Sequence, residues 1–356
     1  MNIKRRNLLL GLVGATVPLI VSSCASEQAG RSSSDNAPTA SGNNSKATSS
    51  GGSVPDKIRI GYQVIPNGEL LVKALGLAAK AFPNSQVQYT SFDSGRDVNT
   101  AIAANGIDFG LVGSVPASVG IAQGLAYQVY FIHDIIGSAE ALIGKNGIGA
   151  IADLKGKKVA TPFGSTAHFS LESLLLQEKI DQKDVNILDL QPPDIVAAWQ
   201  RGDIDASYVW EPNLGKLKKD GGQIITTSAE VAKKGIITAD VGVVRKEFAE
   251  KYPDVVKKYI TLLDEAVKIY RTDPKTAIAA LAKEINITPA ETEAGTNGVI
   301  WLDSTEQKDA KYLGSASQPG DFAKILKSSA DFAVTQKKIN AAPDLVAYQQ
   351  AIYAKQ

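Results

Sequence analysis

Short apolar runs alternate with helical patterns along the first part of the chain that follows residue 56. The runs read IRIGYQV at 58–64, VQYTSF at 87–92, DFGLVG at 108–113 and YQVYFI at 127–132. Between them, apolar positions recur with helical spacing over 69–82, 98–105 and 117–125. Strands that alternate with helices of this kind are typical of an α/β protein with crossover helices, so we expect a mainly parallel sheet.

A second set of runs follows and predicts a second sheet. Its strands are expected in EALIG at 140–144, KKVAT at 157–161, VNILDL at 185–190, ASYVW at 206–210 and QIITT at 223–227. The run VGVVR at 241–245 would return to the first sheet, so the chain would cross between the sheets near 135–140 and again near 237–240. Open α/β sheets bind ligands at the carboxyl ends of their strands. Two such sheets facing each other predict a ligand cleft with two hinge crossovers.

The segment 158–177, KVATPFGSTAHFSLESLLLQ, predicts a strand, a tight loop and the start of a helix. Ser165 stands where an N-cap belongs, ahead of apolar positions with helical spacing. A helix start leaves backbone N–H groups without partners and carries the positive end of the helix dipole, and Ser165 and Thr166 add hydroxyl groups there. The segment therefore suits a small anion, although a Ser165 that only caps its own helix explains the motif equally well.

The N-terminus has the pattern of an exported lipoprotein. Basic residues at 4–6 precede an apolar run over 8–21, which is followed by two serines and Cys24, the only cysteine of the chain. This run fits a signal peptide better than a transmembrane helix, and residues 21–24 resemble a bacterial lipobox. The following stretch to residue 53 is rich in Ser, Gly, Ala, Thr and Asn and predicts a disordered tether.

Composition and charge narrow the possible functions. The chain has 38 basic and 37 acidic side chains, a formal net charge of +1, which gives no electrostatic reason to expect a nucleic-acid partner. Only two histidines, His133 and His168, are present, so a zinc or iron site is not expected. Phosphate-binding loops, dinucleotide-binding loops and nucleophile elbows are also missing from the sequence. We therefore expect a binding protein without a cofactor rather than an enzyme.

Polar residues at the expected strand ends are the candidates for ligand contact. Each also has a structural explanation, such as shaping a turn, pairing at a hinge or filling the core. Asp240 differs from the others, because a carboxylate that leads into the apolar run VGVV just after a crossover would face the cleft, where it would favour a cationic partner. The candidate set is Gln63, Ser94, Gly95, Gly113, Ser114, Glu140, Ser165, Thr166, His168, Tyr208, Trp210 and Asp240.

Over residues 58–253 the sequence resembles the taurine-binding proteins of bacterial ABC importers, within a wider group that binds sulfonates, nitrate and related small ligands. The resemblance rests on six motifs in one order, and it is strongest over the fifth, at residues 190–212. The motifs are GYQ at 61–63, FDSG at 92–95, SAEAL at 138–142, PFGSTAHFSL at 162–171, LQPPDIVAAWQRGDIDASYVWEP at 190–212 and VVRKEFAEKYP at 243–253.

The resemblance implies a two-lobed periplasmic-binding-protein fold of type II that closes on its ligand. The implied division is a signal peptide over 1–23, a tether over 24–55, a first lobe from 56–135 plus 240–356, and a second lobe over 136–239. It further implies a monomer in the periplasm, anchored to the membrane through a lipid on Cys24, that delivers its ligand to a permease driven by an ATPase.

For the site, the resemblance implies that a sulfonate lies at the helix start of Ser165 and Thr166 and that the ligand amine meets Asp240. The family has an aromatic residue two positions after that aspartate, where this chain has Gly242, and this difference predicts a roomier pocket. Taurine or a related aliphatic sulfonate is the expected ligand. The alternatives are nitrate or another small anion, or an enzyme similar to the pyrimidine synthases of thiamine formation, which use the same fold.

Overall fold

The computed structural model describes residues 54–315 and 317–353. The chain divides into two units, Met1–Ser50 and Gly51–Gln356, and the second unit contains all the elements given below. The predicted signal peptide, Cys24 and nearly all of the predicted tether lie outside the described residues. In the part of the chain that is described, no helix has both the length and the apolar character needed to cross a bilayer.

The first sheet has six strands in the order β11-β4-β10-β3-β1-β2. Strand β1 pairs in parallel with β2 and β3, whereas β10 runs antiparallel to both β3 and β4. The short strand β11 extends the edge by pairing antiparallel with β4. The bounds are β1 (Lys57–Gln63), β2 (Gln86–Phe92), β3 (Phe109–Gly113), β4 (Tyr127–Ile136), β10 (Ala239–Arg245) and β11 (Val299–Trp301).

The second sheet has five strands in the order β7-β6-β8-β5-β9. Strand β6 is parallel to β7 and β8, and β5 is antiparallel to β8 and β9. The bounds are β5 (Glu140–Gly144), β6 (Lys158–Thr161), β7 (Asn186–Asp189), β8 (Ala206–Trp210) and β9 (Gln223–Thr227). A two-stranded ribbon, β12 (Gly314–Ser315) and β13 (Gln318–Pro319), stands apart from both sheets.

The expected strands are confirmed, but the expectation of a mainly parallel sheet is wrong, because both sheets are mixed. The reason is the double crossover. Strand β4 leads out of the first sheet into β5, and β10 leads back and inserts between β3 and β4 in the opposite direction. The return of VGVVR to the first sheet is therefore confirmed.

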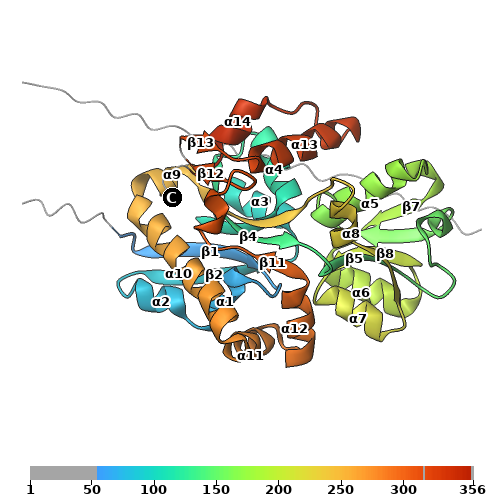
Figure 1. The fold of residues 1–356 in the computed structure, drawn as a ribbon, viewed down its shortest axis with the longest axis horizontal. Helices are drawn as coiled ribbons and strands as arrows, with labels where there is room; N and C mark the ends of the chain where they lie inside the picture. The colour runs from blue at the N-terminus through green and yellow to red at the C-terminus, as the bar shows by residue number, and fades with distance from the viewer. Residues whose placement is uncertain (1–53, 316, 354–356) are drawn as a thin grey trace, which may run out of the picture. The chain divides into compact units, whose positions relative to one another are not determined.

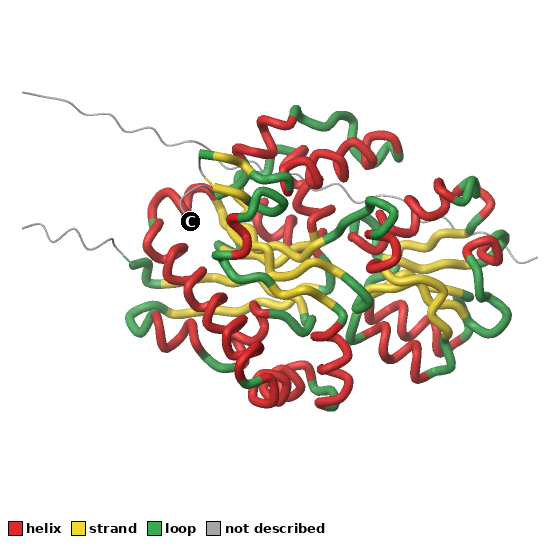
Figure 2. The backbone as a smooth tube through the Cα atoms, viewed as in Figure 1, coloured by secondary structure: helices red, strands yellow, loops and turns green. Residues whose placement is uncertain are grey.

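Helices cover both faces of each sheet, as Figures 1 and 2 show. On one face of the first sheet, α1, α2, α10 and α11 pack on Ile58, Ile60 and Phe109, and on the other α3, α4, α13 and α14 pack on Val112 and Val129. The second sheet lies between α5 and α8 on one face and α6 and α7 on the other. The bounds are α1 (Gly68–Ala74), α2 (Leu77–Ala81), α3 (Gly95–Ala103), α4 (Ser114–Ala122), α5 (Thr166–Gln177), α6 (Pro192–Arg201), α7 (Asn213–Lys219), α8 (Ser228–Ala232), α10 (Pro253–Thr272), α11 (Pro274–Ile285), α13 (Phe322–Thr335) and α14 (Leu345–Gln350).

Local sequence explains where several helices begin and end. The helix expected over 69–82 is split into α1 and α2 because Gly76 adopts a left-handed conformation with φ of 64°. Helix α12 (Pro289–Asn297) begins with a capping box in which Thr288 and Glu291 bond each other's backbone N–H groups. The remaining short elements are α9 (Lys246–Lys251) and the 3₁₀ turns η1 (Ile151–Leu154), η2 (Gln182–Asp184) and η3 (Glu306–Lys308).

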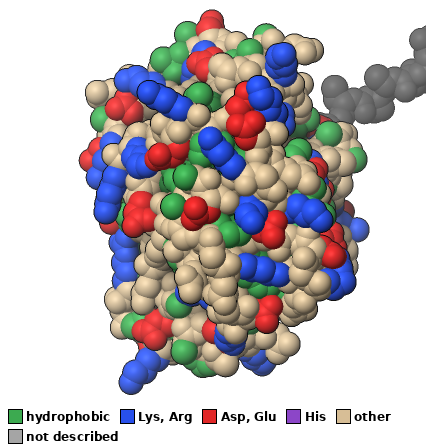
Figure 3. Space-filling view, turned by 90° about the vertical axis from the view of Figure 1, so that its right-hand side faces the viewer, with side chains coloured by type: hydrophobic (Ala, Val, Ile, Leu, Met, Phe, Trp, Pro, Cys, Tyr) green, Lys and Arg blue, Asp and Glu red, His purple; other side chains and the backbone are tan. Residues whose placement is uncertain are grey.

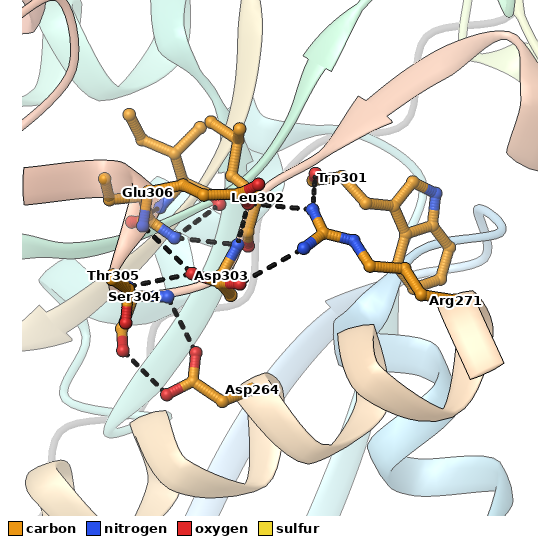
Figure 4. A network of polar contacts seen from close by, with 10 residues as sticks. Asp264, Arg271, Trp301, Leu302, Asp303, Ser304, Thr305 and Glu306 are labelled. Carbon is orange, nitrogen blue, oxygen red and sulfur yellow. Dashed lines mark hydrogen bonds and ion pairs between the residues drawn. The ribbon is translucent and has the colours of Figure 1, made fainter. Parts of the chain in front are cut away.

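A polar network fixes the segment that follows β11 onto helix α10 (Figure 4). Arg271 donates to the carbonyl oxygen of Trp301 at 2.9 Å and forms ion pairs with Asp303 and Glu306 at 3.1 and 2.7 Å. From the same helix, Asp264 accepts hydrogen bonds from the backbone and the hydroxyl group of Ser304, both at 2.7 Å. The network holds β11 against the edge of the sheet, next to the first crossover.

Polar contacts also join the two lobes away from the crossovers. Arg96 of α3 forms an ion pair with Asp189 of β7 at 2.7 Å, and Lys219 of α7 forms one with Glu291 of α12 at 2.5 Å. The face of the molecule that Figure 3 presents carries Lys and Arg interspersed with Asp and Glu. This face therefore offers no broad field of one sign to a charged macromolecule.

Candidate functional site

A cavity lies between the two lobes, where strand ends of both sheets meet. Its walls come from the ends of β1, β3 and β8, from the crossover strands β4, β5 and β10, and from α12. Most of the predicted site residues line it, namely Gln63, Gly95, Gly113, Glu140, Ser165, Thr166, Trp210 and Asp240. Whether these residues contact a ligand stays a prediction, but the fold does bring them to one place.

Several helices begin at this cavity. Asn67 is the N-cap of α1, Gly95 is the first residue of α3, Gly113 is the N-cap of α4 and Thr166 is the first residue of α5, and all four line the cavity. The first N–H groups of a helix have no intrahelical acceptor, and the helix dipole adds positive potential there. The cavity is therefore suited to an anion, and this property comes from backbone rather than from basic side chains.

The start of α5 shows which donors are available. Ser165 caps the helix by accepting from the N–H of His168 at 3.1 Å, and its own hydroxyl donates to the carbonyl oxygen of Pro162 at 2.6 Å. The hydroxyl of Thr166 donates to Glu140 at 2.5 Å. Both hydroxyl groups thus already have acceptors, contrary to the expectation that they are extra donors for an anion. The N–H groups of Thr166 and Ala167 remain without an intrahelical acceptor.

Two aspartates stand opposite each other on neighbouring strands at the cavity wall. Asp240 of β10 pairs directly with Asp134 of β4, and both residues line the cavity. Two like charges at directly opposite positions favour a proton on one of the two groups. Burial raises the pKa of Asp240 to about 8, with a further contribution from Glu140, and burial also raises the pKa of Asp134 well above its usual value.

Glu140 is a third carboxyl group beside this pair, and it is 1% exposed. It accepts from the hydroxyl of Thr166 and, at 2.7 Å, from that of Ser228. Burial raises the pKa of Glu140 to about 7, and these two hydrogen bonds act in the opposite direction. Because two carboxylates directly across a strand pair repel each other, an arrangement of this kind favours either a bound proton or a bound cation.

No basic side chain balances these acids at the cavity wall. Among the described residues that line the cavity, none is Lys, Arg or His. Across residues 54–315 and 317–353, no group of three or more His, Cys, Asp or Glu side chains has a geometry that could hold a metal ion.

Four predicted site residues are buried outside the cavity lining. Ser94 is the N-cap residue of α3 and donates to Asp97 at 3.3 Å, while the hydroxyl of Ser114 accepts from the N–H of Ala239 at 3.2 Å. The latter bond fixes the point where β10 enters the first sheet. Neither side chain is directed to the cavity, and both have structural roles.

His168 and Tyr208 do not line the cavity but contact residues close to it. The ring of His168 stacks on Phe163, accepts from the N–H of Gly164 and lies 3.1 Å from Glu172, one turn along its own helix. The hydroxyl of Tyr208 lies 3.0 Å from that of Ser228, which in turn donates to Glu140. His168 therefore belongs to the packing of α5, and Tyr208 orients a residue that orients Glu140.

Some lining residues were not predicted from the sequence. Asp134 lies within an apolar strand, Asn67 lies in a loop, and Glu211 follows directly after β8. Asn67 accepts from the N–H of Leu70 through its side-chain oxygen, while its amide nitrogen is buried without a hydrogen-bond partner. The only local signal for these residues was a polar side chain beside a predicted strand end.

The roomier pocket expected from Gly242 is not found. Gly242 does not line the cavity, and a Cβ atom at this position would lie 2.6 Å from the ring of Tyr130. The phenol of Tyr130 thus fills the space that an aromatic residue at 242 would need. The absence of a side chain at this position therefore adds no room to the cavity.

Comparisons with known proteins give the family and the fold of this chain. Residues 55–286 match the model of the NMT1-like family. The sequence is 34% identical to the taurine-binding periplasmic protein of Escherichia coli strain K12, over 80% of this chain and 88% of that protein. Among solved structures, the alkanesulfonate-binding protein SsuA from Xanthomonas axonopodis pv. citri, bound to MOPS, matches with a TM-score of 0.69 at 22% identity, over 85% of this chain and 99% of that one.

An enzyme has a similar fold. The desulfurization enzyme DSZB matches with a TM-score of 0.58 at 15% identity, over 83% of this chain and 96% of its own. At such identities the structural likeness shows the fold alone, which is the two-lobed fold of periplasmic binding proteins. The chemistry of the cavity has to decide between uses of this fold.

Proposed function

The chain belongs to the NMT1-like family, and from this membership we propose that it is the substrate-binding protein of an ABC importer that captures taurine or a closely related aminoalkanesulfonate. The ligand would occupy the cavity between the lobes. Its sulfonate would lie against the helix starts at Ser165 and Thr166, and its ammonium group would lie against Asp240.

One observation carries this proposal, namely that acidic side chains and helix starts line the same cavity. The sulfonate is a permanent anion with three acceptor oxygens, which backbone N–H groups at a helix start bind well. The ammonium group supplies the positive charge that Asp240 lacks among the described lining residues of the cavity. A zwitterion that carries both groups on a short chain therefore matches a cavity lined by acidic side chains and helix starts.

The same observation argues against nitrate or a sulfonate without an amine. Either anion would enter a cavity with four carboxyl groups and no basic side chain among its described lining residues. It would bind only while those carboxyl groups stay protonated. We also propose a binding role rather than catalysis, because the relative with 34% identity is a binding protein and the described lining residues include no histidine or cysteine.

The proposal includes the place of action. The protein would be exported to the periplasm, anchored there through a lipid on Cys24, and would act as a monomer that passes its ligand to a membrane permease and its ATPase. Support for export comes from the signal-like N-terminus and from the periplasmic relative. The tether would let the folded part reach the permease while the anchor keeps it near the membrane.

Calorimetric titration of the purified protein with taurine, ethanesulfonate and nitrate tests the proposed ligand. We expect taurine to bind most tightly, ethanesulfonate more weakly and nitrate weakest of the three. Thermal unfolding provides a second readout, because a ligand at one hundred times its Kd stabilises the folded state by about 2.7 kcal/mol. Preferential binding of nitrate would overturn the assignment, and so would the absence of binding by all sulfonates.

A further inference from the structure

Asp134 is the lining residue whose role the proposed function leaves open. It is 1% exposed, and one of its carboxyl oxygens is buried without a hydrogen-bond partner although the residue lines the cavity. Its place opposite Asp240 follows from the register of β4 and β10. An acceptor atom that is buried, unpaired and at a cavity wall costs free energy unless a donor reaches it from the cavity.

We propose that Asp134 and Asp240 act together as one amine-binding pair, which shares a proton in the ligand-free protein and releases that proton to solvent when the ligand's ammonium group enters. This inference rests on the proposed function and adds a second recognition residue and a proton-coupled step to it. It also limits the ligand class to sulfonates with an ammonium group that can donate hydrogen bonds.

The charge balance of the step is simple. In the ligand-free protein the pair carries one proton and a net charge of −1. When the ammonium group enters with its +1 charge, the O–H bond of the protonated carboxyl breaks and its proton leaves through the cavity mouth. Two carboxylates then flank one ammonium group, so the net charge of the pair with its ligand is again −1.

Other titratable groups near Asp134 and Asp240 could also change their protonation when the ligand binds. Glu140 of β5 faces both aspartates, and Glu211 lines the cavity after β8 with its carboxyl group accepting from the N–H of Gly215. His133, next to Asp134 on β4, contacts Glu69 of α1 instead, at 3.6 Å. Because the pKa of Glu140 is about 7, this residue would add its own proton to measurements made below neutral pH.

The proton count therefore has to be measured at pH 7.5. Titration with taurine in two buffers of different ionisation enthalpy gives the number of protons released. We expect wild type to release more than half a proton per taurine, and Asp134→Asn, whose amide can donate to Asp240 in place of the shared proton, to release fewer while it still binds. Between pH 7 and 8 the wild-type affinity should rise with pH, by at most tenfold per unit, and this slope should flatten in Asp134→Asn.

Two controls test whether the released proton comes from the aspartate pair and depends on the amine. The variant Glu247→Gln removes a carboxylate that is 81% exposed, and it should leave the proton count of wild type unchanged. Ethanesulfonate, which has no amine, should release no proton from the wild-type protein. If wild type binds taurine without releasing a proton, or if Asp134→Asn releases as many protons as wild type, the pair does not exchange its proton for the ligand.

Infrared spectroscopy of the ligand-free protein tests the pair independently of the ligand. The difference between wild type and Asp134→Asn at pH 7.5 should contain the carbonyl band of a protonated carboxyl group. If taurine does not bind at all, the proposed function fails, and the infrared band still decides whether the two aspartates share a proton. A difference spectrum without this band would overturn the shared proton whatever the ligand is.

Discussion

Two parts of the cavity wall differ in what supplies their charge. In one part, Asp134 and Asp240 supply negative charge from side chains on neighbouring strands of the first sheet. In the other, the start of α5 supplies positive potential from backbone groups, and its Ser165 and Thr166 side chains already have partners. A side chain can be removed by one substitution, whereas a backbone donor cannot. Ligand affinity should therefore be more sensitive to substitution at the aspartates.

The strongest test of this difference is Asp240→Ala. Removing one partner of a buried charge pair typically costs about 2 to 5 kcal/mol, or roughly 30-fold to several thousand-fold in affinity, and we expect a loss of taurine binding in this range. Ethanesulfonate should bind the variant at least as well as wild type, because a buried acid has been removed and the helix start is intact. Calorimetric titration of both ligands provides the comparison. Equal losses for the two ligands would mean that Asp240 does not meet the amine.

A second substitution acts on a contact between the two lobes. A Cβ atom at Gly113 would lie 2.8 Å from the side chain of Thr166 in the opposite lobe, so Gly113→Ala should push the lobes apart. Overpacking of this kind costs about 1 to 3 kcal/mol, which corresponds to roughly 5- to 150-fold in affinity. Taurine and ethanesulfonate should lose affinity by the same factor in calorimetric titrations.

A matched control separates this effect from the loss of a glycine. Gly149→Ala places its Cβ where no atom lies within 4 Å, and it should leave both affinities unchanged. If Gly113→Ala instead weakens taurine alone, the contact with Thr166 does not limit closure.

The smallest effect on taurine affinity is expected at the start of α5. Ser165→Ala removes an N-cap and should lower the free energy of unfolding by about 1 kcal/mol, while taurine affinity changes by less than about tenfold because the backbone donors remain. Asp344→Ala removes the N-cap of α14, away from the cavity, and should cost similar stability with no change in affinity. Denaturant unfolding and calorimetry measure the two quantities. A loss of affinity as large as that of Asp240→Ala would show that the Ser165 hydroxyl binds the ligand directly.

Local patterns in the sequence were sufficient to predict the strands. Apolar runs bounded by Gly, Pro and Asp mark strands reliably, and the return of residues 241–245 to the first sheet followed from the double crossover. The split between α1 and α2 at Gly76 and the mixed strand directions were missed. Strand direction depends on how the chain returns from the second lobe, and no local pattern contains that information.

Site residues at strand ends could be predicted from the sequence. Residues whose role depends on a neighbour from a distant segment were harder to predict. Asp134 was missed because its importance arises from Asp240, which is distant in sequence and becomes its neighbour only through strand pairing. His168 was placed at the site, although a helical period of 3.6 residues already sets it beside Glu172 on its own helix. Tyr208 and Ser114 do not line the cavity, since Tyr208 lies in the middle of β8 and Ser114 is the first residue of α4.

The position of the aspartates on the crossover strands has a consequence for the order of events during ligand capture. Asp134 lies near the end of β4, just before the chain leaves the first lobe, and Asp240 lies at the start of β10, just after it returns. Groups near the axis of a rotation move least. The two aspartates should therefore already be in position to bind the amine before the lobes close. We expect an incoming zwitterion to dock by its ammonium group first, and its trailing sulfonate then to draw the start of α5 inward.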